Sequence, residues 1–399
     1  MNSAEIRMIE DSRLAKFYAR KPVAIVKGRG MIIFDAEGRE YIDLAGGYGT
    51  CIIGHAHPTV VEAITKQANK LISCHGSTYN DARAALLTRL ATILPAEYGR
   101  VFLSNSGAEA VECAIKLARK STGRRKLVAI KGGFHGKTQG ALSATWDSKY
   151  RKNFEPLVPD FTHIPFGNFE AAKGTISNDT AAVLVEPIQG EGGIRVPPPD
   201  WLPLLRDLTR DAGALLVADE IQTGLGRTGR MFASEHFHVT PDIMCLGKGI
   251  ASGLPMGVTA AGDSIMSSMT VGEHSSTFGG NPVVCAAAEA TITVLVEEKL
   301  VENAAKVGAF FKGQLLNLQR ELRIIREVRG LGLMLGIETR FDVYSILQKG
   351  LENGILLLDA GRNVLRFLPP LSIQPEHVDR VVSCLRNIMV EEQVAKLPS

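Results

Sequence analysis

Two neighbouring segments of the chain decide the fold. The first reads G-A-L-L-V-A-D-E-I-Q-T-G (Gly213–Gly224) and the second reads P-D-I-M-C-L-G-K-G (Pro241–Gly249). Each contains a short apolar run bounded by turn residues, which predicts a buried strand, because the run is too short for a buried helix. The first run, Ala214–Ala218, ends at an acidic pair that begins with Asp219, and the second delivers Lys248 between two glycines.

Asp219 and Lys248 are predicted to face one crevice. In an open parallel sheet, ligands bind outside the carboxyl ends of the strands, which is where both residues fall. A buried carboxylate and an isolated amine together suit pyridoxal phosphate, whose aldehyde condenses with a lysine and whose protonated ring nitrogen needs an acidic partner. A lone Asp or Lys more often simply ends a strand and faces water, so the hypothesis depends on the further motifs described below.

Length and composition predict a large two-domain protein. The chain has 399 residues, of which 45% are hydrophobic, and its net charge of +3 favours neither a nucleic-acid nor a membrane partner. Its six cysteines are scattered without a C-x-x-C motif, which is typical of a reducing compartment. We expect no metal site. The polar N-terminus does not resemble a signal peptide, and no apolar run approaches a membrane span, so we expect a cytoplasmic protein.

Strands and helices alternate from about residue 100 to residue 260. This pattern predicts an α/β domain with a mainly parallel sheet and helices on both faces. Within it, Ser106, Gly107 and Ala108 form a turn that opens a helix, and the free backbone N–H groups of such a turn suit a phosphate. The residues after about 283 are predicted to form a separate α+β domain.

A G-x-G-x-x-G motif at Gly224–Gly229 matches the dinucleotide-binding fingerprint. The residues that follow it do not form the long apolar-faced helix that the fingerprint requires, and five residues separate it from the preceding strand. The sequence therefore argues against a nicotinamide dehydrogenase.

Seven motifs stand together in one order: N-S-G-A-E-A, F-H-G, E-P-I-Q-G-E-G-G, D-E-I-Q-T-G, L-G-K-G, T-F-G-G-N-P and R-F-L-P-P-L. Together they resemble the class III pyridoxal-phosphate aminotransferases, in particular the acetylornithine/ornithine branch. The resemblance implies the fold type I architecture, with a seven-stranded sheet in a large cofactor domain (51–282). A small α+β domain would combine an N-terminal segment (1–50) with the C-terminal part (283–399). It also implies a homodimer with shared active sites.

The resemblance assigns the cofactor contacts residue by residue. Lys248 would hold the cofactor covalently, while Asp219 would bind the protonated ring nitrogen. Phe134 and Ile221 would lie on the two faces of the ring, and Gln222 would approach its hydroxyl group. Asp219 and Lys248 would also be the catalytic pair, because the lysine, once released from the cofactor, can move a proton as a general acid and base.

The phosphate end of the cofactor receives its own set of residues from the resemblance. Ser106, Gly107 and Ala108 would cradle the phosphate, and Thr277 would reach the phosphate bound by the neighbouring subunit. The resemblance also places His135, which directly follows Phe134, among the residues that would bind the cofactor.

The substrate side is also implied by the resemblance. Arg366 would grip a carboxylate of glutamate or 2-oxoglutarate, and Glu191 would neutralise this arginine while a terminal-amine donor is bound. Tyr48 and Tyr79 match positions on the donor side. Lys137 stands where many acetylornithine and ornithine enzymes carry an arginine that holds the donor's α-carboxylate, and lysine lacks the arginine fork.

Further segments of the sequence, including H-G-K-T and L-S-A-T-W-D-S-K-Y-R, resemble those of the archaeal and Thermus-type aminotransferases of lysine and arginine biosynthesis. Those enzymes use lysine or ornithine linked to an acidic amino-group carrier protein of the LysW type. N-acetylornithine and putrescine (or another diamine) remain alternative donors. Aminomutases and decarboxylases share the fold, and a non-enzymatic pyridoxal-phosphate-binding regulator is a remote alternative. The basic residues expected at the mouth of the site are Lys137, Lys149, Arg151 and Lys152.

Overall fold

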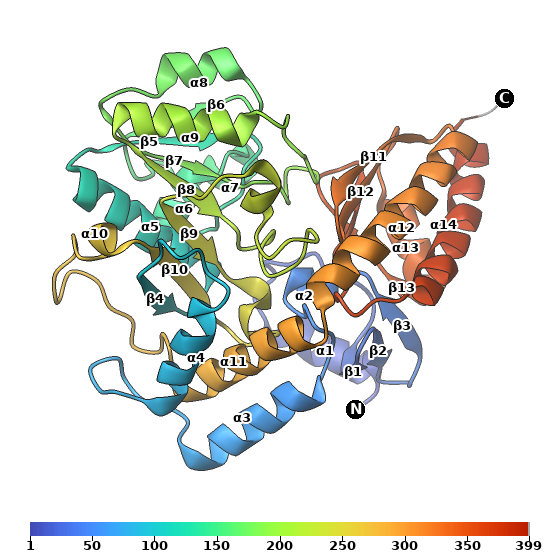
Figure 1. Cartoon of the computed structure of the whole chain (residues 1–399). Helices are drawn as coiled ribbons and strands as arrows, with labels where there is room; N and C mark the ends of the chain where they lie inside the picture. The colour runs from blue at the N-terminus through green and yellow to red at the C-terminus, as the bar shows by residue number, and fades with distance from the viewer. Residues whose placement is uncertain (398–399) are drawn as a thin grey trace.

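A computed structural model describes residues 1–397, and a seven-stranded sheet lies at its centre (Figure 1). Neighbouring strands are parallel except for β10, which is antiparallel to the strand on each side of it. The predicted mainly parallel sheet is therefore confirmed. In sheet order the strands are β4 (Arg100–Ser104), β10 (Gly257–Ala261), β9 (Ile243–Leu246), β8 (Leu215–Asp219), β7 (Thr180–Val185), β5 (Lys126–Ile130) and β6 (Phe161–Ile164).

Both faces of this sheet are buried, which explains the unbroken apolar runs in the sequence. In β7, Ala182 and Leu184 pack toward one apolar cluster, whereas Val183 and Val185 pack toward another on the opposite face. Helices cover each side (Figure 1). The first cluster lies under α5 (Gly107–Thr122), and the second lies under α8 (Phe169–Thr175) and α9 (Trp201–Ala212).

The carboxyl edge of the central strands brings the two organising residues together. Asp219 is the last residue of β8 and pairs in register with Cys245 of β9. The latter strand ends one residue later, and Lys248 then opens the short 3-10 helix η2 (Lys248–Ala251). Because β8 and β9 are parallel and adjacent, both side chains follow strand ends at one edge of the sheet.

The N-terminal region forms a second, four-stranded sheet. It contains the predicted antiparallel meander, and the C-terminal strand β13 pairs in parallel with β3. The glycine-rich segment after the meander forms only the irregular turn α2, in which Gly46, Gly47 and Tyr48 all have φ between 51° and 61°. The elements are α1 (Ser3–Arg13), β1 (Ile25–Arg29), β2 (Ile32–Asp35), β3 (Glu40–Asp43), α2 (Gly46–Gly49) and β13 (Ile355–Leu356).

The C-terminal region builds a third sheet against two long helices (Figure 1). Its strand order is β11 (Ile325–Leu331), β12 (Met334–Thr339), β15 (Val364–Phe367) and β14 (Leu358–Asp359), all antiparallel. The two long helices are α12 (Leu300–Glu321) and α14 (Pro375–Lys396), and the shorter helix α13 (Tyr344–Glu352) packs against α14. The division into domains at residues 50 and 282 stays a prediction, and the last two residues of the C-terminal domain lie outside the described residues.

The remaining helices join these sheets or pack beside them. Helix α11 packs against α3 and α4 (Figure 1). No helix within residues 1–397 is long and apolar enough to cross a membrane. The bounds are α3 (Pro58–Lys70), α4 (Asp81–Ala91), α6 (Gln139–Ala144), α7 (Ser148–Arg151), α10 (Asp263–Met266) and α11 (Pro282–Glu297).

The G-x-G-x-x-G motif forms consecutive turns rather than the start of a helix. These turns lead to the five-residue 3-10 helix η1 (Ala233–Phe237). Arg227, inside the motif, is buried and donates from Nη1 to the carbonyl oxygens of Leu333 (3.2 Å) and Pro369 (2.5 Å). The motif therefore ties the loop after β8 to the C-terminal region, in agreement with the prediction that its sequence lacks the dinucleotide-binding helix.

Candidate active site

One cavity of about 190 Å³ lies at the carboxyl edge of the central strands, and both Asp219 and Lys248 line it. Most of the residues predicted to bind the cofactor or the substrate lie beside them. The further predicted residues in its wall are Gly107, Ala108, Phe134, His135, Glu191, Ile221 and Gln222. Gly136, Glu186, Ile188 and Thr223 complete the lining.

Asp219 is held in place by two hydrogen bonds. One oxygen, Oδ2, lies 2.7 Å from Nδ1 of His135, and the other accepts the backbone N–H of Ile221 at 3.1 Å. Burial disfavours a charged imidazole, but the hydrogen bond with Asp219 outweighs this effect and raises the pKa of His135. The other ring nitrogen of His135 is buried and has no partner among the described residues.

Lys248 occupies a strained backbone position beside the cavity. Its φ of 44° lies in the left-handed region, which is uncommon for residues other than glycine and is a frequent feature of functional sites. Burial lowers the pKa of its amine. Within residues 1–397 no carboxylate lies within ion-pair distance of this amine. A half-buried lysine with no partner and a lowered pKa is suited to act as a nucleophile or a base.

The turn before α5 offers the expected place for an anion. Ser106 caps the helix, because its hydroxyl accepts the N–H of Glu109 at 3.2 Å. A side-chain Cβ at Gly107 would lie 2.8 Å from the Ile221 side chain, so any larger residue here would require Ile221 to move. Gly107 and Ala108 line the cavity, and Ser106 supplies the cap beside it.

The wall of the cavity also contains a second buried carboxylate, Glu186, which immediately follows β7. It accepts the backbone N–H groups of Phe134 and Gly190, each at 3.0 Å. Burial raises the pKa of Glu186 to about 7. The residue thus fixes two loops of the cavity at once, namely the loop that carries Phe134 and the loop that leads to Glu191.

Glu191 forms an ion pair with Arg366, a residue of β15. The Oε1–Nη1 distance is 2.5 Å, and Arg366 is only 1% exposed. Burial disfavours the charged carboxylate, but Arg366 outweighs this effect and lowers the pKa of Glu191. Arg366 retains a buried Nε donor with no partner among the described residues. The guanidinium group lies 5.8 Å from the centre of the Tyr48 ring.

Three predicted residues lie apart from this cavity in the single chain. Tyr79 is fully exposed and lines a different, open depression beside α4. Thr277 is exposed in the loop before α11. Lys137 is also exposed, and its amine lies 5.3 Å from the centre of the Tyr150 ring. The predicted roles of these three side chains stay predictions.

Comparison with known proteins identifies the family. The family model described as aminotransferase class-III matches residues 15–389. The chain belongs to the class III aminotransferases. It is 44% identical to the acetylornithine aminotransferase of Methanopyrus kandleri, with 96% of this chain and 99% of the relative covered. It is 43% identical to a Pyrococcus horikoshii protein provisionally named LysW-aminoadipate semialdehyde/glutamate semialdehyde transaminase, with 93% and 97% covered.

Solved structures agree with this family assignment. The ornithine aminotransferase of Toxoplasma gondii superposes with a TM-score of 0.94 at 35% identity, covering 99% of this chain and 97% of that one. In a second structure of that enzyme, pyridoxal phosphate partly occupies the active site. The fold type I architecture and the aminotransferase activity predicted from the sequence are therefore confirmed. Pyridoxal phosphate is the cofactor of this family and of this aminotransferase.

The residues of the cavity fit pyridoxal phosphate. Lys248, whose amine has no ion-pair partner within residues 1–397, would supply the covalent partner, and the buried Asp219 would supply the acidic partner for the ring nitrogen. Buried polar atoms without partners, Oε1 of Gln222 and Nε2 of His135, add groups able to hydrogen-bond a bound molecule. The set contains no cluster of metal ligands, since no group of three His, Cys, Asp or Glu side chains in residues 1–397 is arranged to hold a metal ion.

Glu186 was given no role by sequence reasoning, although it lines the cavity. A signal was available, because Glu186 directly follows a predicted buried strand, as Asp219 does. Its partners are backbone N–H groups from two separate loops, and a sequence pattern does not reveal such contacts.

Proposed function

We propose that this aminotransferase moves the terminal amino group of carrier-linked lysine or ornithine to 2-oxoglutarate, producing a semialdehyde and glutamate. The observation that supports the proposal most is the Glu191–Arg366 ion pair at the cavity. An unneutralised buried arginine would attract a carboxylate in both half-reactions. When Glu191 occupies the arginine, a donor without a carboxylate at its reacting end is accommodated. When Glu191 moves away, the arginine is free to bind a dicarboxylate by a bidentate contact.

The roles we propose for the catalytic residues follow from their chemistry. Bound pyridoxal phosphate stabilises negative charge that develops on the substrate carbon when its C–H bond ionises. Asp219, fixed by His135 and by the Ile221 N–H, holds a proton at the ring nitrogen. Lys248, with its lowered pKa, removes and returns the substrate proton as a general base and acid. Phe134 and Ile221 enclose the ring, and Glu186 fixes the backbone of Phe134.

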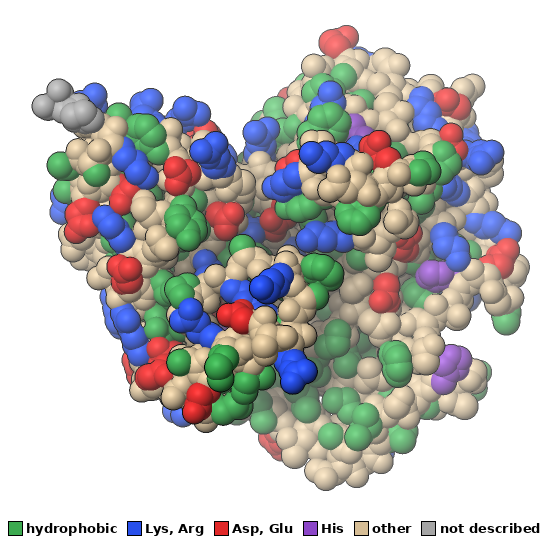
Figure 2. All heavy atoms as spheres, turned by 180° about the vertical axis from the view of Figure 1, so that it is seen from behind, with side chains coloured by type: hydrophobic (Ala, Val, Ile, Leu, Met, Phe, Trp, Pro, Cys, Tyr) green, Lys and Arg blue, Asp and Glu red, His purple; other side chains and the backbone are tan. Residues whose placement is uncertain are grey.

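A carrier-linked donor is supported by two features. The Pyrococcus relatives carry the LysW name, although the methanogen relatives carry the acetylornithine name. Lys137, which is exposed after the Phe134 loop, and Lys149 of α7 both lie against Tyr150, with amines 5.3 and 4.7 Å from the ring centre. Lys149 also pairs with Asp147 at 3.1 Å, so Lys137 is the less neutralised of the two charges. Figure 2 shows Lys and Arg side chains beside the notch between the two lobes of the molecule. An acidic carrier would be attracted to such a surface.

The second candidate donor is N-acetylornithine, which the names of the methanogen relatives favour. Lys137 retains a positive charge for its α-carboxylate but not the arginine fork. Putrescine, which has no carboxylate, is the third candidate. All three kinds of donor react through a terminal amine. The closed Glu191–Arg366 pair would therefore accommodate each of them.

We also propose a cytoplasmic homodimer. All six cysteines are free, which suits a reducing compartment. Tyr79, Phe278 and Val271 are exposed large hydrophobic residues on loops near Thr277 or α4, and a second copy would cover them. A partner would also bring the exposed Thr277 and Tyr79 to a shared site.

Steady-state comparison of four donors tests the proposal: carrier-linked lysine, carrier-linked ornithine, N-acetylornithine and putrescine, each with 2-oxoglutarate. We expect the highest kcat/KM with a carrier-linked donor. We also expect added salt to lower kcat/KM for that donor more than for the small donors, because salt screens attraction between charged surfaces. A kcat/KM for N-acetylornithine that equals or exceeds the carrier-linked values would replace the first candidate with the second.

A further inference from the structure

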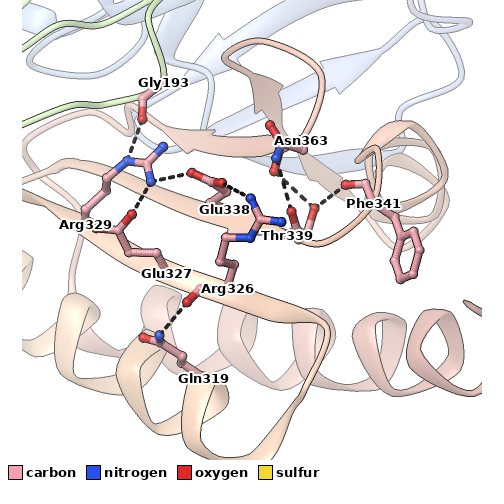
Figure 3. Close-up of polar contacts among 9 residues, drawn as sticks. All are labelled: Gly193, Gln319, Arg326, Glu327, Arg329, Glu338, Thr339, Phe341 and Asn363. Carbon is pink, nitrogen blue, oxygen red and sulfur yellow. Dashed lines mark hydrogen bonds and ion pairs between the residues drawn. The ribbon is translucent and has the colours of Figure 1, made fainter. Parts of the chain in front are cut away.

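Arg329, a residue of β11, joins the C-terminal sheet to the turn that carries Glu191. Its Nε donates to the carbonyl oxygen of Gly193 at 2.8 Å (Figure 3). Its Nη1 contacts Glu338 at 2.7 Å and Glu327 at 2.5 Å, so two carboxylates orient the guanidinium group. The side chain of Arg329 is only 13% exposed. The guanidinium group and Glu338 are therefore largely shielded from water, whereas Glu327 is 55% exposed.

The segment held by Arg329 is a closed turn, which we name the Glu191 turn (residues 189–195). Gln189 and Arg195 pair through two backbone hydrogen bonds of 3.0 Å at its base. The carbonyl of Gly190 accepts the N–H groups of Gly193 and Ile194 at 3.1 and 3.2 Å. Glu191 thus lies near the tip of the turn, two residues before the carbonyl that Arg329 holds.

Gly193 is suited to this contact. Its φ is +107°, a backbone conformation that favours glycine, and a Cβ there would lie 3.2 Å from Nη2 of Arg329. On the other side of the turn, Ile194 is buried against the C-terminal sheet, where a Cβ at Gly336 would approach it to 3.1 Å. The turn and the sheet are therefore closely fitted.

The two arginines that contact the Glu191 turn belong to one row of the C-terminal sheet. Arg329 pairs in register with Gly336 of β12, and Gly336 pairs with Arg366 of β15. Residues directly opposite across antiparallel strands lie on the same face of a sheet. With glycine between them, the two arginines flank the space that Ile194 fills. Arg329 holds the backbone of the turn, and Arg366 holds its carboxylate.

We propose that Arg329 is a positioning residue that keeps Glu191 paired with Arg366 while a terminal-amine donor is bound. This inference rests on the proposed function, in which the pair closes for the donor and opens for the dicarboxylate. With the carbonyl of Gly193 fixed, opening requires only rotation of the Glu191 side chain, and closing returns it to the same place. Loss of Arg329 would loosen the turn and lower the population of the state in which Glu191 pairs with Arg366. Binding of the donor would then weaken, whereas binding of the dicarboxylate would not.

The test compares Arg329→Gln with Arg326→Gln in the holoenzyme. Arg326 is a matched control because it lies on the same strand and contacts the same Glu338, at 3.0 Å, but its side chain is 55% exposed and contacts no residue of the Glu191 turn. Arg329→Lys serves as a milder variant, which keeps the charge and loses the fork. Three readouts are needed: kcat/KM for N-acetylornithine, KM for 2-oxoglutarate, and calorimetric affinity for glutarate, an unreactive dicarboxylate.

We expect Arg329→Gln to lower kcat/KM for N-acetylornithine on the order of tenfold, as for residues that act in one network. The KM for 2-oxoglutarate should not rise, and glutarate should bind as tightly as before or more tightly. Arg326→Gln should change none of these values. If Arg329→Gln weakens glutarate binding and donor use equally, or matches Arg326→Gln, the proposal is overturned.

A second comparison separates this proposal from the proposed function. In a Glu191→Gln background, Arg329→Gln should produce no further change in donor preference, since it acts through Glu191; a full additional effect overturns the inference. Arg366→Lys, which should raise the KM for 2-oxoglutarate, tests the proposed function itself. A selective effect of Arg366→Lys with none from Arg329→Gln removes only the inference. An unchanged KM in Arg366→Lys removes both.

Discussion

Asp219 and His135 share a hydrogen bond of 2.7 Å, and both residues are buried. The second oxygen of Asp219 accepts the backbone N–H of Ile221, so neighbouring protein groups orient both oxygens of the carboxylate. Its neighbours in the cavity wall, Phe134 and Lys248, follow the ends of separate strands. The edge of the sheet therefore places a fixed carboxylate and an amine in the wall of one cavity.

Replacing Asp219 with Asn should remove the carboxylate that we propose holds a proton at the ring nitrogen. We expect kcat to fall by about 10²–10⁴-fold, the range for loss of a positioned acid–base group. Pre-steady-state absorbance of each half-reaction measures this effect. Asp242→Asn is a control, because Asp242 directly precedes β9 and pairs with Arg206 away from the cavity. A kcat for Asp219→Asn within twofold of wild type contradicts the assigned role.

Glu186 should make the stability of the protein depend on pH. Burial raises its folded-state pKa from 4.5 to about 7, so the folded state binds the proton more tightly than the unfolded state. Stability from this group is therefore highest below pH 4.5 and declines as pH rises toward about 7, by about 3 kcal/mol in total. In Glu186→Gln this decline should be absent. Denaturant unfolding of both proteins across this range measures the difference, and parallel pH profiles would contradict the expectation.

Arg366→Lys should affect the two substrates unequally. Lysine can still pair with Glu191 but cannot grip a carboxylate with two parallel N–H groups. We expect the KM for 2-oxoglutarate to rise by about tenfold to a hundredfold, the value of a hydrogen bond to a charged group. The KM for the amine donor should change little. Initial-rate kinetics with each substrate varied in turn provides the measurement, and an equal rise in both values would count against the switch.

Lys137→Arg should raise kcat/KM for small donors that carry an α-carboxylate. Arginine restores the fork at a side chain that lies over Tyr150 in the loop after Phe134. We expect kcat/KM for N-acetylornithine to rise roughly three- to tenfold, while putrescine, which has no carboxylate, is unaffected. Lys152→Arg is the matched control in the same basic segment. No change in the ratio of the two donors would place Lys137 outside the donor site.

The central sheet could be predicted because its strands are buried on both faces. Such strands read as continuous apolar runs, and the polar residue that ends each run marks the functional edge. Asp219 and Lys248 were therefore found from sequence alone. The same logic would have found Glu186, whose strand ends in the same way.

Contacts between distant segments could not be predicted. Arg329 contacts Gly193 across 136 positions of sequence, and the residues beside Arg329 in the sequence give no sign of that partner. Buried Arg227 bonds to two backbone carbonyls, which have no sequence signature. Thr277 and Tyr79 are exposed in one chain, so their predicted roles depend on a second copy.

The central claim is that Lys248 carries the cofactor at the end of β9. Borohydride reduction of the purified holoenzyme, followed by peptide mass spectrometry, identifies the lysine that is joined to pyridoxal phosphate. We expect the modification on the peptide that contains Lys248, and none on that peptide in Lys248→Ala. Stoichiometric modification of any other lysine would contradict the account.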